Sequence, residues 1–165
     1  MKVLAGDIGG TKTLLQIAEV RGTRIEILYE ARFPSQVYGD FESLLEDFLR
    51  QAPADLRNIA AACFGVAGPV SGPAHGPRTA RITNLPWYMD EGHLAQCLQL
   101  PRVRLINDFF ATAAGIEALG EEDFAVLNPA EALPGAARLV VGAGTGLGVA
   151  QLFWCGEGYH ACPSE

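Results

Sequence analysis

The order of the apolar segments constrains the fold of this chain more than any other feature of its sequence. Three short strand-like runs come first, over residues 2–6, 13–20 and 24–33, and tight glycine-bearing connections join them. Such connections favour an antiparallel meander. A helical pattern follows over residues 41–49, and a continuous apolar run over residues 59–66 is typical of a central strand covered on both faces. This order predicts an α/β fold with a mixed sheet.

The rest of the chain continues with alternating strand and helix patterns. Asp40 and Asp90 are predicted N-caps of two helices, and a third helix is predicted over residues 109–119. Further strands are predicted over residues 78–83, 103–106, 124–127, 139–141 and 147–153. Because the last two form a new hairpin, we expect two domains, at residues 1–110 and 111–165. No helix follows that could cover the apolar face of the hairpin, so we expect the second domain to be truncated.

Composition and charge argue against several classes of protein. The 165 residues carry a net charge of −7, with 49% hydrophobic and 19% charged residues. This balance suits a globular cytoplasmic protein and offers no basic surface for nucleic acid. The N-terminus lacks a signal-peptide pattern, and the longest apolar stretch is glycine-rich and shorter than the roughly 20 residues that span a bilayer. We therefore expect neither a nucleic-acid partner nor a membrane segment.

The four cysteines form no CxxC pair. Cys63 and Cys97 lie among apolar residues, so we expect them to be buried thiols in a reducing compartment. Cys155, His160 and Cys162 are three soft ligands close together in the sequence. Their spacing matches no familiar zinc motif, so we do not predict a zinc site there.

The segment from Asp7 to Lys12 has the composition of a phosphate-binding turn. Asp7 stands at the end of the first strand, where a carboxylate can hold Mg²⁺, usually through water. Gly9 and Gly10 let backbone N–H groups approach a phosphate, while Thr11 adds a hydroxyl and Lys12 a positive charge. A plain hairpin turn explains the same two glycines, and the sequence alone leaves both interpretations open.

A second glycine-rich loop lies in the hairpin near residue 144. It contains Gly142, Gly144, Thr145, Gly146 and Gly148. The loop is neither a dinucleotide-binding motif nor a P-loop, because a strand pattern follows it and no Gly-Lys-Ser/Thr ends it. A tight hairpin would not need four glycines in seven positions. Phosphate binding is therefore favoured over a plain turn.

Asn107 and Asp108 end an apolar strand and lead into a helix. Ligands gather at the carboxyl ends of strands in open α/β sheets, where a carboxylate can accept a hydroxyl proton and an amide can orient a sugar. Taken alone, the pair is explained better by Asp108 as a helix cap. The loops at Gly68 and at Asn84, the latter near Trp87, suit a neutral polyol and equally suit an ordinary structured loop.

Taken together, these motifs resemble the bacterial glucokinase family, within the actin-like ATPase superfamily of sugar kinases. The matching stretches occur in the family's order, at residues 6–11, 68–72, 83–87, 105–109 and 142–149. The resemblance implies an α/β, ribonuclease H-like lobe with a mixed sheet, followed by the first hairpin of a second α/β lobe. It implies ATP-dependent phosphorylation of glucose, with Mg²⁺, in a protein about twice this length.

The resemblance also implies a role for each motif. Asp108 would act as general base toward the sugar's 6-hydroxyl. The sugar would be held by Asn84, Asn107, Asp108 and Glu165. The ATP phosphates would be bound by Asp7, Gly9, Gly10, Thr11, Lys12, Gly144, Thr145 and Gly146, and Asp7 would hold Mg²⁺ through water. Glu165 fits the family's sugar-binding glutamate better than Glu157, which lies too close to the glycine loop.

One residue departs from the family pattern. Lys12 stands where many glucokinases have Asn, as in the related ROK-type sugar kinases, although their cysteine-rich zinc motif is absent. The sequence therefore leaves open a kinase for another hexose and a sugar- or nucleotide-binding regulator without turnover. It also leaves open both a monomer and a homodimer. The chain by itself is expected to be inactive.

Overall fold

The computed structural model describes residues 1–22, 24–73, 75–143 and 147–163. The chain divides into two compact units, Met1–Asp108 and Phe109–Glu165, and the division falls at the start of helix α3 (Asp108–Gly115). Each unit is described below by itself. No helix in these ranges is long and apolar enough to cross a membrane.

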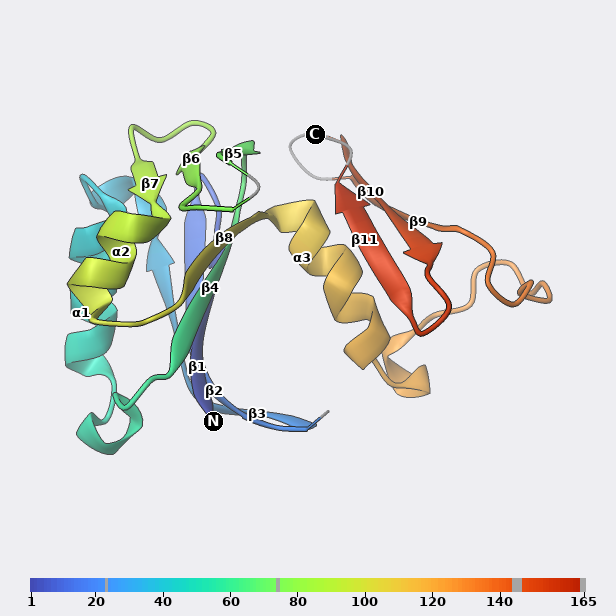
Figure 1. The fold of residues 1–165 in the computed structure, drawn as a ribbon, viewed down its shortest axis with the longest axis horizontal. Helices are drawn as coiled ribbons and strands as arrows, with labels where there is room; N and C mark the ends of the chain where they lie inside the picture. The colour runs from blue at the N-terminus through green and yellow to red at the C-terminus, as the bar shows by residue number, and fades with distance from the viewer. Residues whose placement is uncertain (23, 74, 144–146, 164–165) are drawn as a thin grey trace. The chain divides into compact units, whose positions relative to one another are not determined.

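The first unit is built on a five-stranded sheet in the order β3-β2-β1-β4-β8 (Figure 1). Its strands are β1 (Lys2–Ile8), β2 (Lys12–Arg21), β3 (Arg24–Pro34), β4 (Ala61–Val66) and β8 (Val103–Asn107). The first three form the predicted antiparallel meander, while β1, β4 and β8 run parallel. The mixed α/β sheet predicted from the sequence is therefore confirmed.

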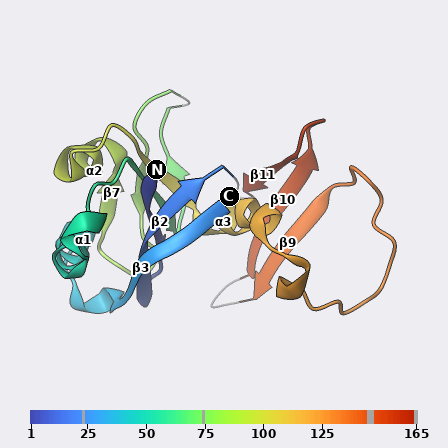
Figure 2. The same cartoon turned by 90° about the horizontal axis from the view of Figure 1, so that it is seen from below.

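Two helices cover one face of this sheet, α1 (Phe41–Gln51) and α2 (Glu91–Leu98) (Figure 2). Both begin at the predicted caps, because the carboxylates of Asp40 and Asp90 each accept a backbone N–H at 2.8 Å. The core lies between helices and sheet, where the Phe41 ring meets Phe64 edge-on with centroids 5.0 Å apart. Burial of these aromatic rings supplies much of the hydrophobic stabilisation of the unit.

A small second sheet follows β4, in the order β5-β6-β7. It consists of β5 (Val70–Ser71), β6 (Thr79–Arg81) and β7 (Tyr88–Asp90), where the sequence predicted one strand over residues 78–83. The buried carboxylate of Glu91 joins this sheet to the main one. It accepts the backbone N–H of Arg78 at 2.9 Å and that of Leu105 at 2.8 Å.

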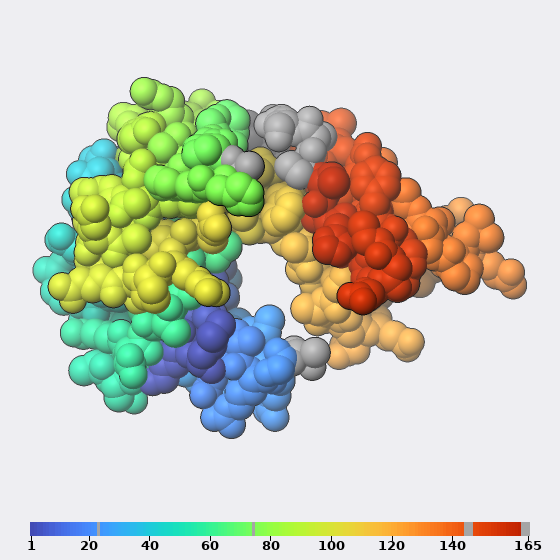
Figure 3. Space-filling model, in the orientation of Figure 1, coloured from blue at the N-terminus to red at the C-terminus, as the bar shows by residue number. Residues whose placement is uncertain are grey.

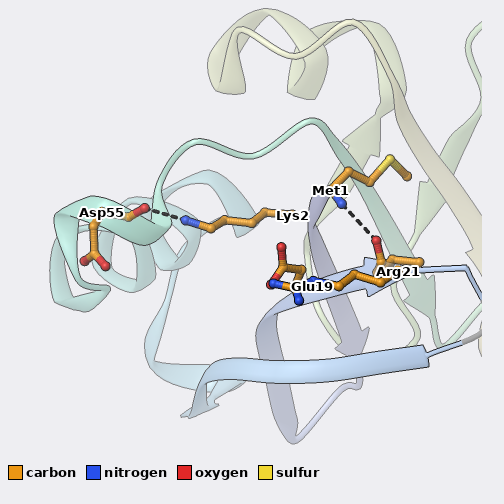
Figure 4. Close-up of polar contacts among 6 residues, drawn as sticks. Met1, Lys2, Glu19, Arg21 and Asp55 are labelled. Carbon is orange, nitrogen blue, oxygen red and sulfur yellow. Dashed lines mark hydrogen bonds and ion pairs between the residues drawn. The ribbon is translucent and has the colours of Figure 1, made fainter.

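The N-terminal end of β1 is fixed to neighbouring segments by polar contacts, shown in Figure 4. The terminal amino group of Met1 donates to the carbonyl of Val20 at 2.8 Å. Lys2 Nζ donates to the carbonyl of Asp55 at 2.5 Å, in the short 3-10 helix η2 (Ala54–Leu56). These contacts hold the N-terminal end of β1, and Asp7 lies near its other end.

The second unit contains α3 and a three-stranded sheet in the order β11-β10-β9. Its strands are β9 (Arg138–Ala143), β10 (Leu147–Trp154) and β11 (Tyr159–Pro163), of which β11 was not predicted. Leu152 is buried in a small cluster with Ala113 of α3 and Ala150. Helix α3, which precedes the hairpin in the sequence, therefore covers Leu152, although no helix after the hairpin was expected to do so. Leu147 and Phe153 remain exposed.

Of the two elements predicted between β8 and β9, the helix is present in a different form and the strand is wrong. The third helix ends at Gly115 and continues as the 3-10 helix η3 (Ile116–Ala118), instead of running to residue 119; a further 3-10 turn, η4, spans Glu121–Asp123. No strand forms over residues 124–127, although this segment lies within the described residues. The apolar run has no strand to pair with and stays exposed. Figure 3 shows the segment that leads from η4 to β9, in orange, projecting from its unit.

The prediction of buried thiols is also wrong, because Cys63 and Cys97 are both exposed. Cys63 alternates along β4 with the buried Ala62 and Phe64, and so faces the opposite side of the sheet.

Within the described ranges, no three His, Cys, Asp or Glu side chains are grouped so that they could hold a metal ion.

Candidate functional site

The candidate site of the first unit lies where its three parallel strands end. Ile8 of β1 pairs with Val66 of β4, and Val66 pairs with Asn107 of β8. The residues that follow these positions therefore leave the same edge of the sheet. This edge receives the turn after β1, the loop after β4 and the Asn107-Asp108 pair, which is where an open α/β sheet places its ligands.

The turn after β1 is closed by a hydrogen bond within its own backbone and is supported by Ser35, which directly follows β3. The Gly9 N–H donates to the Lys12 carbonyl at 3.0 Å, and the Ser35 hydroxyl donates to the Gly9 carbonyl at 2.7 Å. The Ser35 hydroxyl also lies 2.9 Å from that of Thr13, and both side chains are fully buried. Ser35 was missed by the sequence analysis, because only the β2–β3 register brings it beside the turn. Thr11 and Lys12 are exposed.

Gly10 brings this turn against the loop that carries Asn84. A Cβ atom on Gly10 would lie 2.7 Å from the carbonyl oxygen of Thr83 and 3.6 Å from the Asn84 Cβ. Because Gly10 does not have a positive φ, close approach explains its lack of a side chain. The Thr83 N–H donates to Ala67 at 2.9 Å, which ties the same loop to the end of β4.

Asn84 itself is exposed and has a left-handed backbone, with φ of 64°. Asn tolerates this conformation better than most residues, and the residue thereby turns the loop back toward the buried Trp87. The Trp87 indole donates to the Tyr38 carbonyl at 3.1 Å and packs on Phe41. Trp87 is therefore a core residue, and of the two interpretations left open for this loop its burial favours an ordinary structured loop.

The Asn107-Asp108 pair completes the edge. The side-chain amide of Asn107 donates to the Gly68 carbonyl at 3.4 Å, and α3 begins at Asp108 itself. Both side chains are half-buried. The pKa of Asp7 is raised above its usual value, first by desolvation and second by the negative charge of Asp108. The two carboxylates that the sequence assigned to metal and proton transfer therefore share one electrostatic environment.

The second glycine-rich segment lies in the second unit, in the β9–β10 hairpin. Gly142 and Gly148 pair across the two strands, and the Phe109 ring of α3 packs on them. The phosphate-binding candidates between them, Gly144, Thr145 and Gly146, lie outside the described residues, as does Glu165.

Comparison with known proteins decides the family. The model of the Glucokinase family matches residues 4–165. This chain belongs to the Glucokinase family. It is 39% identical to the glucokinase of Nostoc sp. over 99% of this chain and 46% of that protein. It is 40% identical to the glucokinase of Synechocystis sp. over 98% of this chain and 47% of that protein. The resemblance predicted from the motifs is confirmed, and the chain spans about half the length of these relatives.

Solved glucokinase structures share the fold. The glucokinase of an Antarctic psychrotroph has a TM-score of 0.84 and 26% identity, and the match covers 99% of this chain and 50% of that one. The glucokinase of Balamuthia mandrillaris, solved in complex with glucose, has a TM-score of 0.72 and 24% identity over 99% of this chain and 47% of that one. The sugar-kinase fold implied by the motifs is therefore confirmed.

Proposed function

We propose that the complete protein containing this chain transfers the γ-phosphoryl group of ATP to the 6-hydroxyl of glucose, with Asp108 as general base. The observation that carries the proposal is the meeting of Asp7, the Asn84 loop and Asp108 at one edge of a sheet in a member of the Glucokinase family. Phosphoryl transfer to an alcohol needs a positioned hydroxyl, neutralised phosphate charge and a nearby carboxylate. At this edge Asn84 can position the hydroxyl, Lys12 can neutralise phosphate charge, and Asp108 is the nearby carboxylate.

On the sugar side, Asp108 accepts the hydroxyl proton as the oxygen attacks phosphorus. Its place at the start of α3, after a strand held by parallel pairing, gives the carboxylate a rigid support. Asn84 and Asn107 donate and accept hydrogen bonds with the neighbouring hydroxyls, and Glu165 adds a further acceptor. Amides can both donate to and accept from a hydroxyl, and carboxylates can accept from one, so together they can orient a neutral polyol.

On the phosphate side, the backbone of Gly9, Gly10 and Thr11 approaches the phosphates of ATP, and Lys12 supplies a positive charge. The loop formed by Gly144, Thr145 and Gly146 provides a second backbone cradle. The missing side chain of Gly10 would allow the backbone to approach a phosphate, and it also leaves room for the Thr83 carbonyl. Its place in the motif therefore does not by itself prove contact with phosphate.

The residues present fit a magnesium ion. Mg²⁺ usually keeps several waters and binds through one or two carboxylates together with substrate phosphates, so it needs no cluster of three protein ligands. The pKa of Asp7 is raised first by desolvation and second by the charge of Asp108, and a cation beside the two carboxylates would offset both effects. Asp7 would hold the ion through water. When bound, Mg²⁺ neutralises charge that develops on the phosphates.

The test is steady-state turnover of the purified complete protein with ATP and a panel of hexoses, namely glucose, mannose and N-acetylmannosamine. The proposal expects glucose to have the highest kcat/KM. A higher kcat/KM for another hexose would support phosphoryl transfer to a sugar but would show that glucose is not the preferred substrate. Sugar and nucleotide binding without turnover on any hexose would instead favour a regulatory protein.

A further inference from the structure

The inner face of the β9–β10 hairpin carries an aromatic ring where its two strands have no side chains. Gly142 and Gly148 are cross-strand partners. A Cβ atom on Gly142 would lie 2.5 Å from the Phe109 ring, and one on Gly148 would overlap that ring. The ring therefore lies directly against the backbone of both strands, and any other residue at position 148 would displace it.

This packing explains two glycines that the sequence analysis counted toward phosphate binding. Neither Gly142 nor Gly148 has a positive φ, so backbone conformation does not require them. Close approach of Phe109 does require them. The ring joins the cluster formed by Ala113, Ala150 and Leu152, so it belongs to the core of the second unit.

The packed ring links two parts of the proposed machinery along the chain. Phe109 directly follows Asp108, in the first turn of α3. The glycines beneath its ring stand two residues before Gly144 and two residues after Gly146, at the two ends of the proposed phosphate loop. The Phe109 side chain thus packs the first turn of α3 against both β9 and β10. Asp108, the proposed general base, begins that helix, and the proposed phosphate loop connects those two strands.

We propose that Phe109 is a positioning residue, which holds the first turn of α3 against strands β9 and β10 during phosphoryl transfer. The inference rests on the proposed function. Transfer requires in-line placement of donor and acceptor, and a misplacement of 1 Å can cost about 10²-fold in rate. In this proposal Phe109 acts through its neighbour Asp108 and through the two strands on which its ring packs.

The test compares Phe109→Ala and Phe109→Leu with Ile116→Ala in the complete protein. Ile116 packs against the same cluster from η3 without lying on the two glycines, so it controls for a general loss of packing. Phe109→Ala should lower kcat about 10- to 100-fold and raise KM for ATP, with glucose affinity within about 2-fold. Phe109→Leu should recover part of the loss. Ile116→Ala should lower the Tm without changing KM for ATP.

A second pair of variants tests the contact itself. Gly148→Ala should lower activity strongly, because its Cβ overlaps the Phe109 ring. The double variant Phe109→Ala/Gly148→Ala should be more active than Gly148→Ala alone, because the smaller side chain makes room for the new methyl group. The inference is overturned if the double variant is less active than both single variants.

The outcomes separate this inference from the function on which it rests. Normal turnover of the wild type, with Phe109→Ala matching Ile116→Ala in kcat and KM, would overturn the positioning role alone. Absence of hexose phosphorylation by the wild type would overturn the proposed function and the positioning role with it.

Discussion

The negative charge of Asp108 reaches Asp7: after the desolvation of Asp7 itself, it is the second cause that raises the Asp7 pKa. Asp7 lies in β1 and Asp108 directly follows β8; β4 separates these strands, and the parallel register brings their ends to one edge. The coupling predicts that Asp108→Asn lowers the Asp7 pKa toward its ordinary value. Carboxyl ¹³C NMR titration without magnesium measures this shift. An unchanged Asp7 pKa would show that the two carboxylates do not interact.

The same shift predicts how Asp7 affects stability. The pKa of Asp7 is higher in the folded protein than its ordinary value of 3.8, so protonation of Asp7 stabilises the folded state. This stabilisation is fully present below pH 3.8 and is lost as the pH rises through the pKa of Asp7 in the folded protein. Asp7→Asn should therefore be more stable than the wild type at pH 7, with a smaller difference at acid pH. Urea unfolding at several pH values without magnesium tests this, and a variant less stable at pH 7 would contradict it.

Gly10→Ala should disturb the meeting of the two loops at the sheet edge. Its Cβ would lie 2.7 Å from the Thr83 carbonyl oxygen, a backbone atom that cannot rotate away. Such overpacking costs about 1–3 kcal/mol of unfolding free energy. Gly39→Ala is the matched control, because its Cβ would meet nothing within 4 Å, and its effect should stay within about 0.5 kcal/mol. Equal unfolding midpoints for the two variants would refute the close approach.

The 165-residue chain alone should show no measurable glucose phosphorylation. It spans about half the length of its glucokinase relatives, and its second sheet leaves Leu139, Val141 and Leu147 largely exposed. Catalysis needs both reactants held in line and water excluded, which we do not expect of a chain about half as long as its relatives. A coupled assay of glucose 6-phosphate formation, run beside the complete protein, measures this. Robust turnover that is abolished by Asp108→Asn in the short chain would contradict the prediction.

Local signals in the sequence predicted much of the first unit. Asp40 and Asp90 cap their helices through contacts three residues away, so their role depends on little else. The continuous apolar run ending at Val66 predicted a central strand, and β4 does lie between β1 and β8, although the predicted cover on both faces is absent at the exposed Cys63. The Asn107-Asp108 pair could be placed at a strand end for the same reason.

What the sequence did not predict depends on contacts between distant residues. Ser35 supports the turn after β1 through the register of β2 and β3, which no local pattern specifies. Trp87 is buried because Tyr38 accepts its N–H and Phe41 packs on it. The Gly142–Gly148 pair resembled part of a phosphate loop because the Phe109 ring that it accommodates lies more than thirty residues earlier.

The most direct test of the account is the turnover of Asp108→Asn in the complete protein, with Asp55→Asn as the matched control on an exposed residue. If Asp108 is the general base, its substitution should lower kcat about 10²–10⁴-fold, while glucose affinity measured by calorimetry stays within several-fold. Asp55→Asn should retain wild-type kcat. Near-wild-type turnover by Asp108→Asn would show instead that Asp108 only begins a helix, and would contradict the central claim.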